Sequence, residues 1–136
     1  MLHLATALTV FAAVACSKDN PTGHEHADVF RVALVLGIDE IAATGHLPIT
    51  HGEQNRVQLH LYDEHGGLIT DVDHFQISLA FTPETVASAT PVTGTTTFFD
   101  ITSSQSPDTE GSLMITIYHP HTETTKTFGP YAILIH

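Results

Sequence analysis

The chain has 136 residues, a length that suits one domain, and its 42% hydrophobic content argues against disorder. Fifteen Asp and Glu residues stand against four Lys and Arg, and the resulting net charge of −11 argues against a nucleic-acid partner, which would require clustered cations. The single cysteine excludes an internal disulfide framework. Eleven residues are histidine, so histidine is the unusual feature of this composition.

The first fifteen residues are uncharged and mostly apolar. The stretch Leu4–Ala15 has the length of a signal-peptide apolar region, and it is too short to cross a hydrocarbon core about 30 Å thick. Its end, Ala13-Val14-Ala15-Cys16, resembles the lipobox of bacterial lipoprotein precursors. The resemblance implies that 1–15 is a signal peptide cleaved before Cys16, and that Cys16 carries a lipid anchor. The alternative is a free cysteine at the end of a buried apolar segment.

Residues 16–27 are polar and contain Ser, Asp, Asn, Pro and Gly, which is typical of a flexible tether. In Gram-negative lipoproteins a serine after the lipidated cysteine, here Ser17, implies the outer membrane. The run Ser17-Lys18-Asp19-Asn20 also resembles the export tether of Bacteroidetes surface lipoproteins. We therefore expect a cell-envelope lipoprotein in the outer membrane that faces the periplasm or the cell surface.

From Val29 onward, apolar residues alternate with polar ones, which is the pattern of half-buried strands. We find no window of eleven or more residues with helical periodicity. Clusters rich in Gly, Pro, Asp, Ser and Thr separate the alternating runs. The pattern predicts strands at about 29–36, 39–44, 55–62, 74–81, 95–101, 112–119 and 127–135.

Seven short strands predict an all-β fold, a single antiparallel sandwich of immunoglobulin-like type over residues 28–136. The chain resembles bacterial Ig-like domains at the level of this strand pattern alone. The cysteine pair and core tryptophan of antibody domains are absent from it. An up-and-down barrel is the alternative architecture.

Histidine is the commonest metal-binding side chain, so its excess points to a divalent transition metal. Two pairs have metal-ligand spacing. His24 and His26 flank a glutamate in the tether, and short histidine-rich tracts collect metal ions. His119 and His121 flank Pro120, and residues i and i+2 share a face in extended chain. The alternatives are a polar linker for the first pair and an exposed loop for the second.

The other histidines are weaker candidates. His60 lies on the polar face of the strand predicted at 55–62, and His65 lies in the turn that follows it. The segment Asp71-Val72-Asp73-His74 places two carboxylates and an imidazole close together. Taken singly, each of these positions is better explained as an ordinary polar turn or strand end than as a metal site. Further histidines at weak positions are His46, His51 and His136.

The chain contains no nucleophile motif of the G-x-S-x-G type and no H-E-x-x-H zinc motif. We therefore expect no catalytic or organic cofactor-binding residues, and no enzyme. With only two methionines, the sequence favours Zn²⁺ or Cu²⁺ over Cu⁺. The expected function is metal scavenging, buffering or delivery by a membrane-tethered module. The alternative is a structural or adhesive Ig-like module that contacts a protein or glycan at the cell envelope.

Overall fold

The computed structural model describes residues 27–42 and 44–136, and every regular element in them is a β-strand. The nine strands are β1 Arg31–Leu36, β2 Asp39–Glu40, β3 His46–Ile49, β4 Asn55–Tyr62, β5 Gln76–Thr82, β6 Ser88–Pro91, β7 Phe98–Thr102, β8 Glu110–His119 and β9 Thr124–Ile135. Within these residues no helix is long and apolar enough to cross a membrane. The prediction of an all-β domain is confirmed. The predicted signal peptide, Cys16 and the tether up to residue 26 lie outside the described residues.

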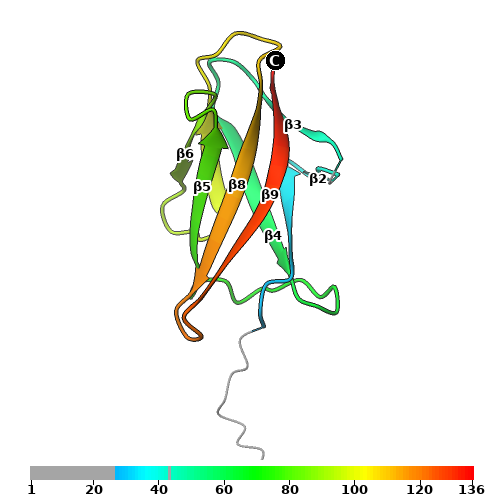
Figure 1. Ribbon diagram of the computed structural model, residues 1–136, viewed down its shortest axis with the longest axis vertical. Helices are drawn as coiled ribbons and strands as arrows, with labels where there is room; N and C mark the ends of the chain where they lie inside the picture. The colour runs from blue at the N-terminus through cyan, green and yellow to red at the C-terminus, as the bar shows by residue number, and fades with distance from the viewer. Residues whose placement is uncertain (1–26, 43) are drawn as a thin grey trace, which may run out of the picture.

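The strands form two sheets that face each other (Figure 1). One sheet has the order β2-β1-β4-β7-β6 and the other has the order β3-β9-β8-β5. Strand neighbours are antiparallel except that β3 runs parallel to β9, with His46 opposite Ala132. The prediction of seven antiparallel strands is therefore corrected: the described residues form nine strands, and the second sheet is mixed.

The predicted boundaries fail where strands are short. The strand predicted at 55–62 coincides with β4. The strand predicted at 39–44 is reduced to the two residues of β2, because the chain makes a hydrogen-bonded turn that closes at Gly45. The sequence did not predict β3 or β6, since each has four residues and contains a proline, Pro48 or Pro91.

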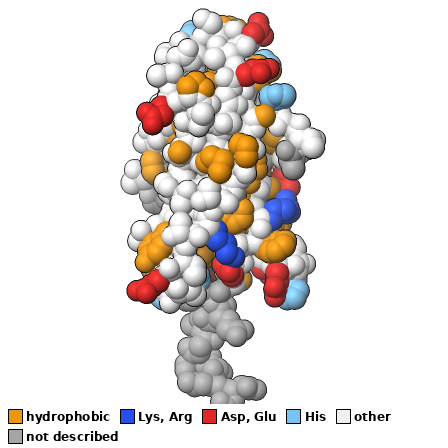
Figure 2. Space-filling model, in the orientation of Figure 1, with side chains coloured by type: hydrophobic (Ala, Val, Ile, Leu, Met, Phe, Trp, Pro, Cys, Tyr) orange, Lys and Arg blue, Asp and Glu red, His pale blue; other side chains and the backbone are white. Residues whose placement is uncertain are grey.

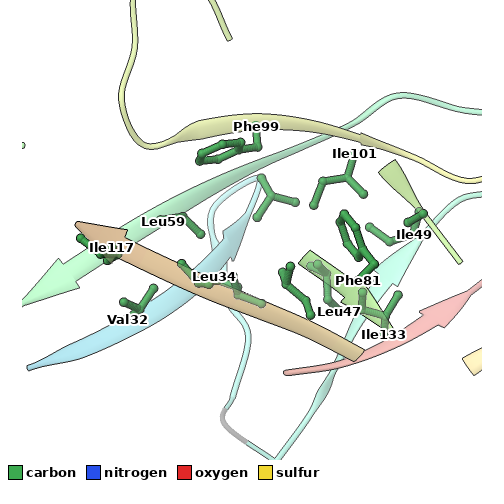
Figure 3. Packing of buried hydrophobic residues seen from close by; sticks show 14 of the residues in the cluster. Val32, Leu34, Leu47, Ile49, Leu59, Phe81, Phe99, Ile101, Ile117 and Ile133 are labelled. Atoms are coloured by element: carbon green, nitrogen blue, oxygen red, sulfur yellow. The ribbon is translucent and has the colours of Figure 1, made fainter. Parts of the chain in front are cut away.

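One hydrophobic core lies between the sheets (Figure 3). Alternation produces it: in β4 the side chains of Val57, Leu59 and Leu61 are at most 2% exposed, whereas His60 lies on the opposite face. Burying one such side chain contributes about 1.5–3 kcal/mol. Residues of both sheets meet there, among them Val32, Leu34, Leu47, Ile49, Leu59, Phe81, Phe99, Ile101, Ile117 and Ile133. The core therefore fixes the two sheets relative to each other.

A bulge allows β9 to continue through a proline. The pairing of β8 with β9 shifts between Leu113 and Ile115, where Gly129 and Pro130 together face Met114. Bulges accommodate proline because the ladder is already interrupted there. Gly129 has a φ of 116°, a conformation that residues with a Cβ rarely adopt. The pairing of β8 with β9 resumes beyond the bulge and ends at His119.

Two side chains of β9 contact β1 and the residues just before it, in the other sheet. The hydroxyl of Tyr131 donates a hydrogen bond to the carbonyl of Val32 at 2.9 Å. Nearer the N-terminal end, the Nζ of Lys126 donates to the carbonyl of Val29 at 3.0 Å and lies 2.5 Å from a carboxylate oxygen of Asp28. These contacts hold the first described residues against the domain, at the end where the candidate site lies.

Candidate functional site

Three segments that are distant in the sequence meet at the lower end of the domain (Figure 1). They are the residues before β1, the connection between β4 and β5, and the β8–β9 hairpin. A cavity of about 650 Å³ lies among them. Its lining residues are Ala27, Asp28, Phe30, Asp63, Glu64, His65, His119, His121, Thr122 and Lys126. The cavity thus opens beside the point where the predicted tether joins the domain.

The β8–β9 hairpin positions two imidazoles. His119 is the last residue of β8, it continues the inward-facing row of that strand, and it is 3% exposed. Pro120 then interrupts the ladder because it has no N–H to donate. Thr124 is the cross-strand partner of His119, so His121 lies in the turn between them and is exposed. The hairpin therefore presents one buried and one exposed histidine to the cavity.

His74 approaches the same place from the β4–β5 connection. Its side chain is 11% exposed, and its Nδ1 lies 3.7 Å from the nearer carboxylate oxygen of Asp71. The ring of Phe75 lies 4.1 Å from that of His74 and 4.9 Å from that of His119, as measured between centroids. A turn in which the N–H of Phe75 donates to the carbonyl of Val72 at 3.0 Å precedes β5. The end of the core thus provides one apolar wall for both imidazoles.

We call His74, His119 and His121 the histidine cluster. The centroid of the His74 ring lies 4.9 Å from that of His119 and 5.7 Å from that of His121, and the last two are 5.9 Å apart. Both ring nitrogens of His74 and of His119 are shielded from solvent. Across residues 27–42 and 44–136, no group of three or more His, Cys, Asp or Glu side chains is already arranged to hold a metal ion. The cluster supplies close imidazoles rather than a formed coordination sphere.

Carboxylates border the cavity and give it a negative character. Asp28 is paired with Lys126, whereas Asp63 accepts hydrogen bonds from the main-chain N–H groups of His65 and Gly67, both at 2.8 Å. These bonds fix the turn after β4. Figure 2 shows acidic and histidine side chains at both ends of the molecule, the lower end included. Such a cavity favours cations, since focused negative potential raises their local concentration.

The predicted metal ligands fall into three groups. His119 and His121 lie together in the hairpin, and His65 lines the same cavity with a side chain that is 84% exposed. His60 is on the outward face of β4, with its ring centroid 6.3 Å from that of Tyr62, and it does not line the cavity. The tether pair, His24 and His26, lies outside the described residues, as does the predicted lipidation site, Cys16.

His74 is the cluster member that the sequence singled out only weakly. It follows two aspartates and lies two residues before the first residue of β5, so its sequence context indicates only an ordinary polar strand end. The signal that would have found it is strand pairing. Because Gln76 pairs with Tyr118, the start of β5 lies level with the end of β8, and His74 comes beside His119.

Contacts between strands outside the cavity shift the pKa values of several charged side chains. Arg31 and Tyr62 donate hydrogen bonds to the carboxylate of Glu40 at 3.1 and 3.0 Å, and they lower the pKa of that group. Arg56 lies directly opposite Asp100, and the two-pronged hydrogen bond between them lowers the pKa of Asp100 and raises the pKa of Arg56. These contacts join strands of the five-stranded sheet, so we interpret them as structural.

No protein-family model matches the chain, and no curated protein is significantly similar to it. The functional argument therefore depends on the site itself.

Proposed function

We propose that the domain is an extracytoplasmic metal-binding module that takes up Zn²⁺ or Cu²⁺ through His74, His119 and His121. The observation that carries this proposal is the histidine cluster, in which two segments far apart in the sequence bring three imidazoles together. Neutral imidazole binds both ions well. The proposed role is scavenging, buffering or delivery of the ion, without catalysis.

The spacing of the rings supports this proposal. An imidazole bound at about 2.0–2.1 Å has its centroid about 3 Å from the ion, so two such rings on a tetrahedral ion have centroids about 5 Å apart. The cluster has separations of 4.9, 5.7 and 5.9 Å. Metal binding then requires the rings to turn one nitrogen each toward the ion. Rotation about the second side-chain torsion of histidine is soft, and His121 is exposed.

The surroundings of the cluster support a cation as the ligand. His65, Asp63 and Glu64 line the same cavity as His121. The predicted tether ligands His24 and His26 immediately precede Ala27, which also lines the cavity. We propose that these residues collect the ion before it reaches the cluster. His60 has no part in this proposal, because it lies on the outer face of β4 and away from the cavity.

We assign the fold, as part of the same proposal, to the immunoglobulin-like sandwiches. In constant-type Ig domains, strands A, B, E and D form one sheet and strands C, F and G the other. Here β1, β4, β7 and β6 are adjacent in that order, and so are β9, β8 and β5, which would be G, F and C. Strands β2 and β3 would be additions at the two sheet edges beside β1 and β9. The lipid anchor at Cys16 and the outer-membrane location belong to the proposal as well.

A structural or adhesive role is the second candidate function. The outer face of the four-stranded sheet carries a row of hydroxyl side chains across three strands, with Ser78 opposite Thr116 and Thr116 opposite Thr127. A hydroxyl-bearing face suits contact with a protein or glycan partner at the cell envelope. This candidate predicts no dependence on the histidine cluster.

Calorimetry tests the metal proposal. The protein is residues 16–136 with Cys16→Ser, titrated with Zn²⁺ and with Cu²⁺ at pH 7.4. We expect at least one ion to bind with a Kd below about 100 μM, and we expect His119→Gln/His121→Ala to abolish this binding while deletion of residues 17–27 only weakens it. His46→Ala on β3 is the matched control and should bind as the parent does. Binding weaker than about 100 μM for both ions would rule the proposal out.

A further inference from the structure

The two sheets have four edge strands, and three of these are protected against pairing with another chain. β2 has only two residues, both acidic, at Asp39–Glu40. β3 and β6 have four residues each and contain Pro48 and Pro91. Short length, charge and proline are the features by which natural proteins block exposed edges.

The fourth edge, β5, has none of these features. Its seven residues, Gln76–Thr82, include no charged residue and no proline. Within the described residues it pairs with β8 alone, so its other side presents main-chain N–H and C=O groups. A long, uncharged and unprotected edge is a surface suited to pairing with a further strand.

The inner face of β5 is incompletely covered. Ile77 and Leu79 are partly exposed, although their partners on β8, Ile117 and Ile115, are buried at 3% and 0% exposure. The core therefore ends at β5 with apolar surface still in contact with water. A strand added beside β5 would cover this surface and extend the four-stranded sheet (Figure 1).

We propose that the added strand is β5 of a second copy, paired antiparallel about a twofold axis at Leu79. Identical antiparallel strands are self-complementary under such an axis. Leu79 is the middle residue of β5, so this register pairs all seven residues. It sets Ile77 against Phe81 of the second copy on the inner face and Ser78 against Ala80 of the second copy on the outer face. A slip of one residue would set inner residues against outer ones.

The charge of the chain does not oppose a second copy along this edge. The chain carries a net charge of −11, so two copies repel each other over most of their surfaces. β5 contributes no carboxylate, and its outward side chains are small or neutral, so close approach sets no like charges against each other along the strand. Asp73 and Glu84 lie beyond its two ends. Salt should therefore strengthen the dimer by screening the remaining repulsion.

Multi-angle light scattering and sedimentation equilibrium test this proposal on residues 16–136 with Cys16→Ser and without added metal. A pair of seven-residue strands makes a small interface, so we expect a dimer with a Kd on the order of 10–100 μM that tightens with salt. The double variant Ser78→Glu/Ala80→Glu sets two pairs of like charges across the axis and should raise the Kd about tenfold or more. Ser78→Lys/Ala80→Glu sets opposite charges at the same positions and should restore the dimer.

The matched control is Thr125→Glu/Thr127→Glu, which adds the same charges to exposed positions of β9, inside the same sheet. It should leave the Kd within about twofold of the parent value. A parent protein that stays monomeric at about 200 μM overturns the proposal, and the β5 edge would then be available only to a different chain. Failure of the Lys/Glu variant to restore the dimer overturns the register. The proposal does not depend on metal binding, since it concerns another surface.

Discussion

The imidazole rings of His74 and His119 lie with their centroids 4.9 Å apart, although one residue precedes β5 and the other ends β8. Phe75 contacts both rings from the side of the core. The antiparallel pairing of β5 with β8 enforces this arrangement, because it sets the start of one strand beside the end of the other. The approach of His74 to His119 is thus a consequence of strand register rather than of a local sequence motif.

The first prediction concerns His74. If the ion binds in the histidine cluster, His74→Ala removes one imidazole and should weaken Zn²⁺ or Cu²⁺ binding by at least about tenfold, since the loss of even an outer-shell group costs that much. His60→Ala removes a histidine from the outer face of β4 and should leave binding unchanged. Calorimetry measures both, with thermal unfolding as the check on folding. Equal effects of the two substitutions would contradict a site in the cluster.

The sequence predicted part of this site. It singled out His119 and His121, whose ring centroids lie 5.9 Å apart, but the two residues do not share a face of β8, because His121 lies in the turn after Pro120. The approach of His74 was not predictable, because it depends on which strands pair and in which register. His60 lies on the polar face of β4 as the alternation predicted, but the alternation could not show that the cavity lies elsewhere. Local patterns thus identify candidate ligands, whereas tertiary pairing decides which of them meet.

The second prediction concerns the bulge in β9. A Cβ on Gly129 would lie 2.7 Å from the main-chain carbonyl oxygen of Leu113, and the φ of 116° is itself unfavourable for other residues. We expect Gly129→Ala to lower the free energy of unfolding by about 3 kcal/mol or more, as measured by urea denaturation.

Gly94→Ala is the matched control for that substitution. Gly94 also has a positive φ, 81°, but a Cβ there would meet nothing within 4 Å. Backbone strain alone should cost about 1 kcal/mol. If the two variants are equally destabilised, the steric contact with Leu113 is not the cause.

The fold shows the same division between local and tertiary information. The strand at 55–62 was predicted correctly because its alternation continues over eight residues. β3 lies where the sequence indicated a loop, and it exists because β9 offers a parallel partner, with Leu47 opposite Ile133. β6 forms in a similar way against β7, where Ala89 faces Ile101. Short strands of this kind are stabilised by the strands beside them, so their own residues do little to predict them.

The third prediction concerns the hairpin that carries His121. Glu123 has a φ of 53°, in the left-handed region that costs residues with a Cβ roughly 1 kcal/mol. Glu123→Gly removes this strain and should raise the free energy of unfolding by about 0.5 kcal/mol, after the extra entropy that glycine gives the unfolded chain is subtracted. Glu84→Gly, in an exposed turn with ordinary φ, gains nothing and should be destabilised instead. Thermal and urea unfolding of the two variants measure the contrast, and shifts of the same sign would exclude backbone strain at Glu123.

The fourth prediction concerns acid stability through Glu40. Arg31 and Tyr62 lower the pKa of Glu40 in the folded state below its ordinary value of 4.5. The unfolded state therefore binds the proton more tightly, so the stabilisation from this carboxylate is present above about pH 4.5 and is lost as the pH falls through the folded-state pKa. The carboxylate is 43% exposed, so solvent screening should keep the effect below about 1 kcal/mol.

Glu40→Gln isolates this contribution, because the amide cannot titrate and the other carboxylates remain. Between about pH 6 and pH 3 the free energy of unfolding should fall more for the parent protein than for the variant. The two values should converge at the acid end of this range. Asp100, held by Arg56, titrates in the same direction in both proteins and cancels in the difference. If the free energies of unfolding of parent and variant differ by a constant amount over this pH range, Glu40 stabilises the β1–β2 pair through its shape or hydrogen bonds and not through its charge.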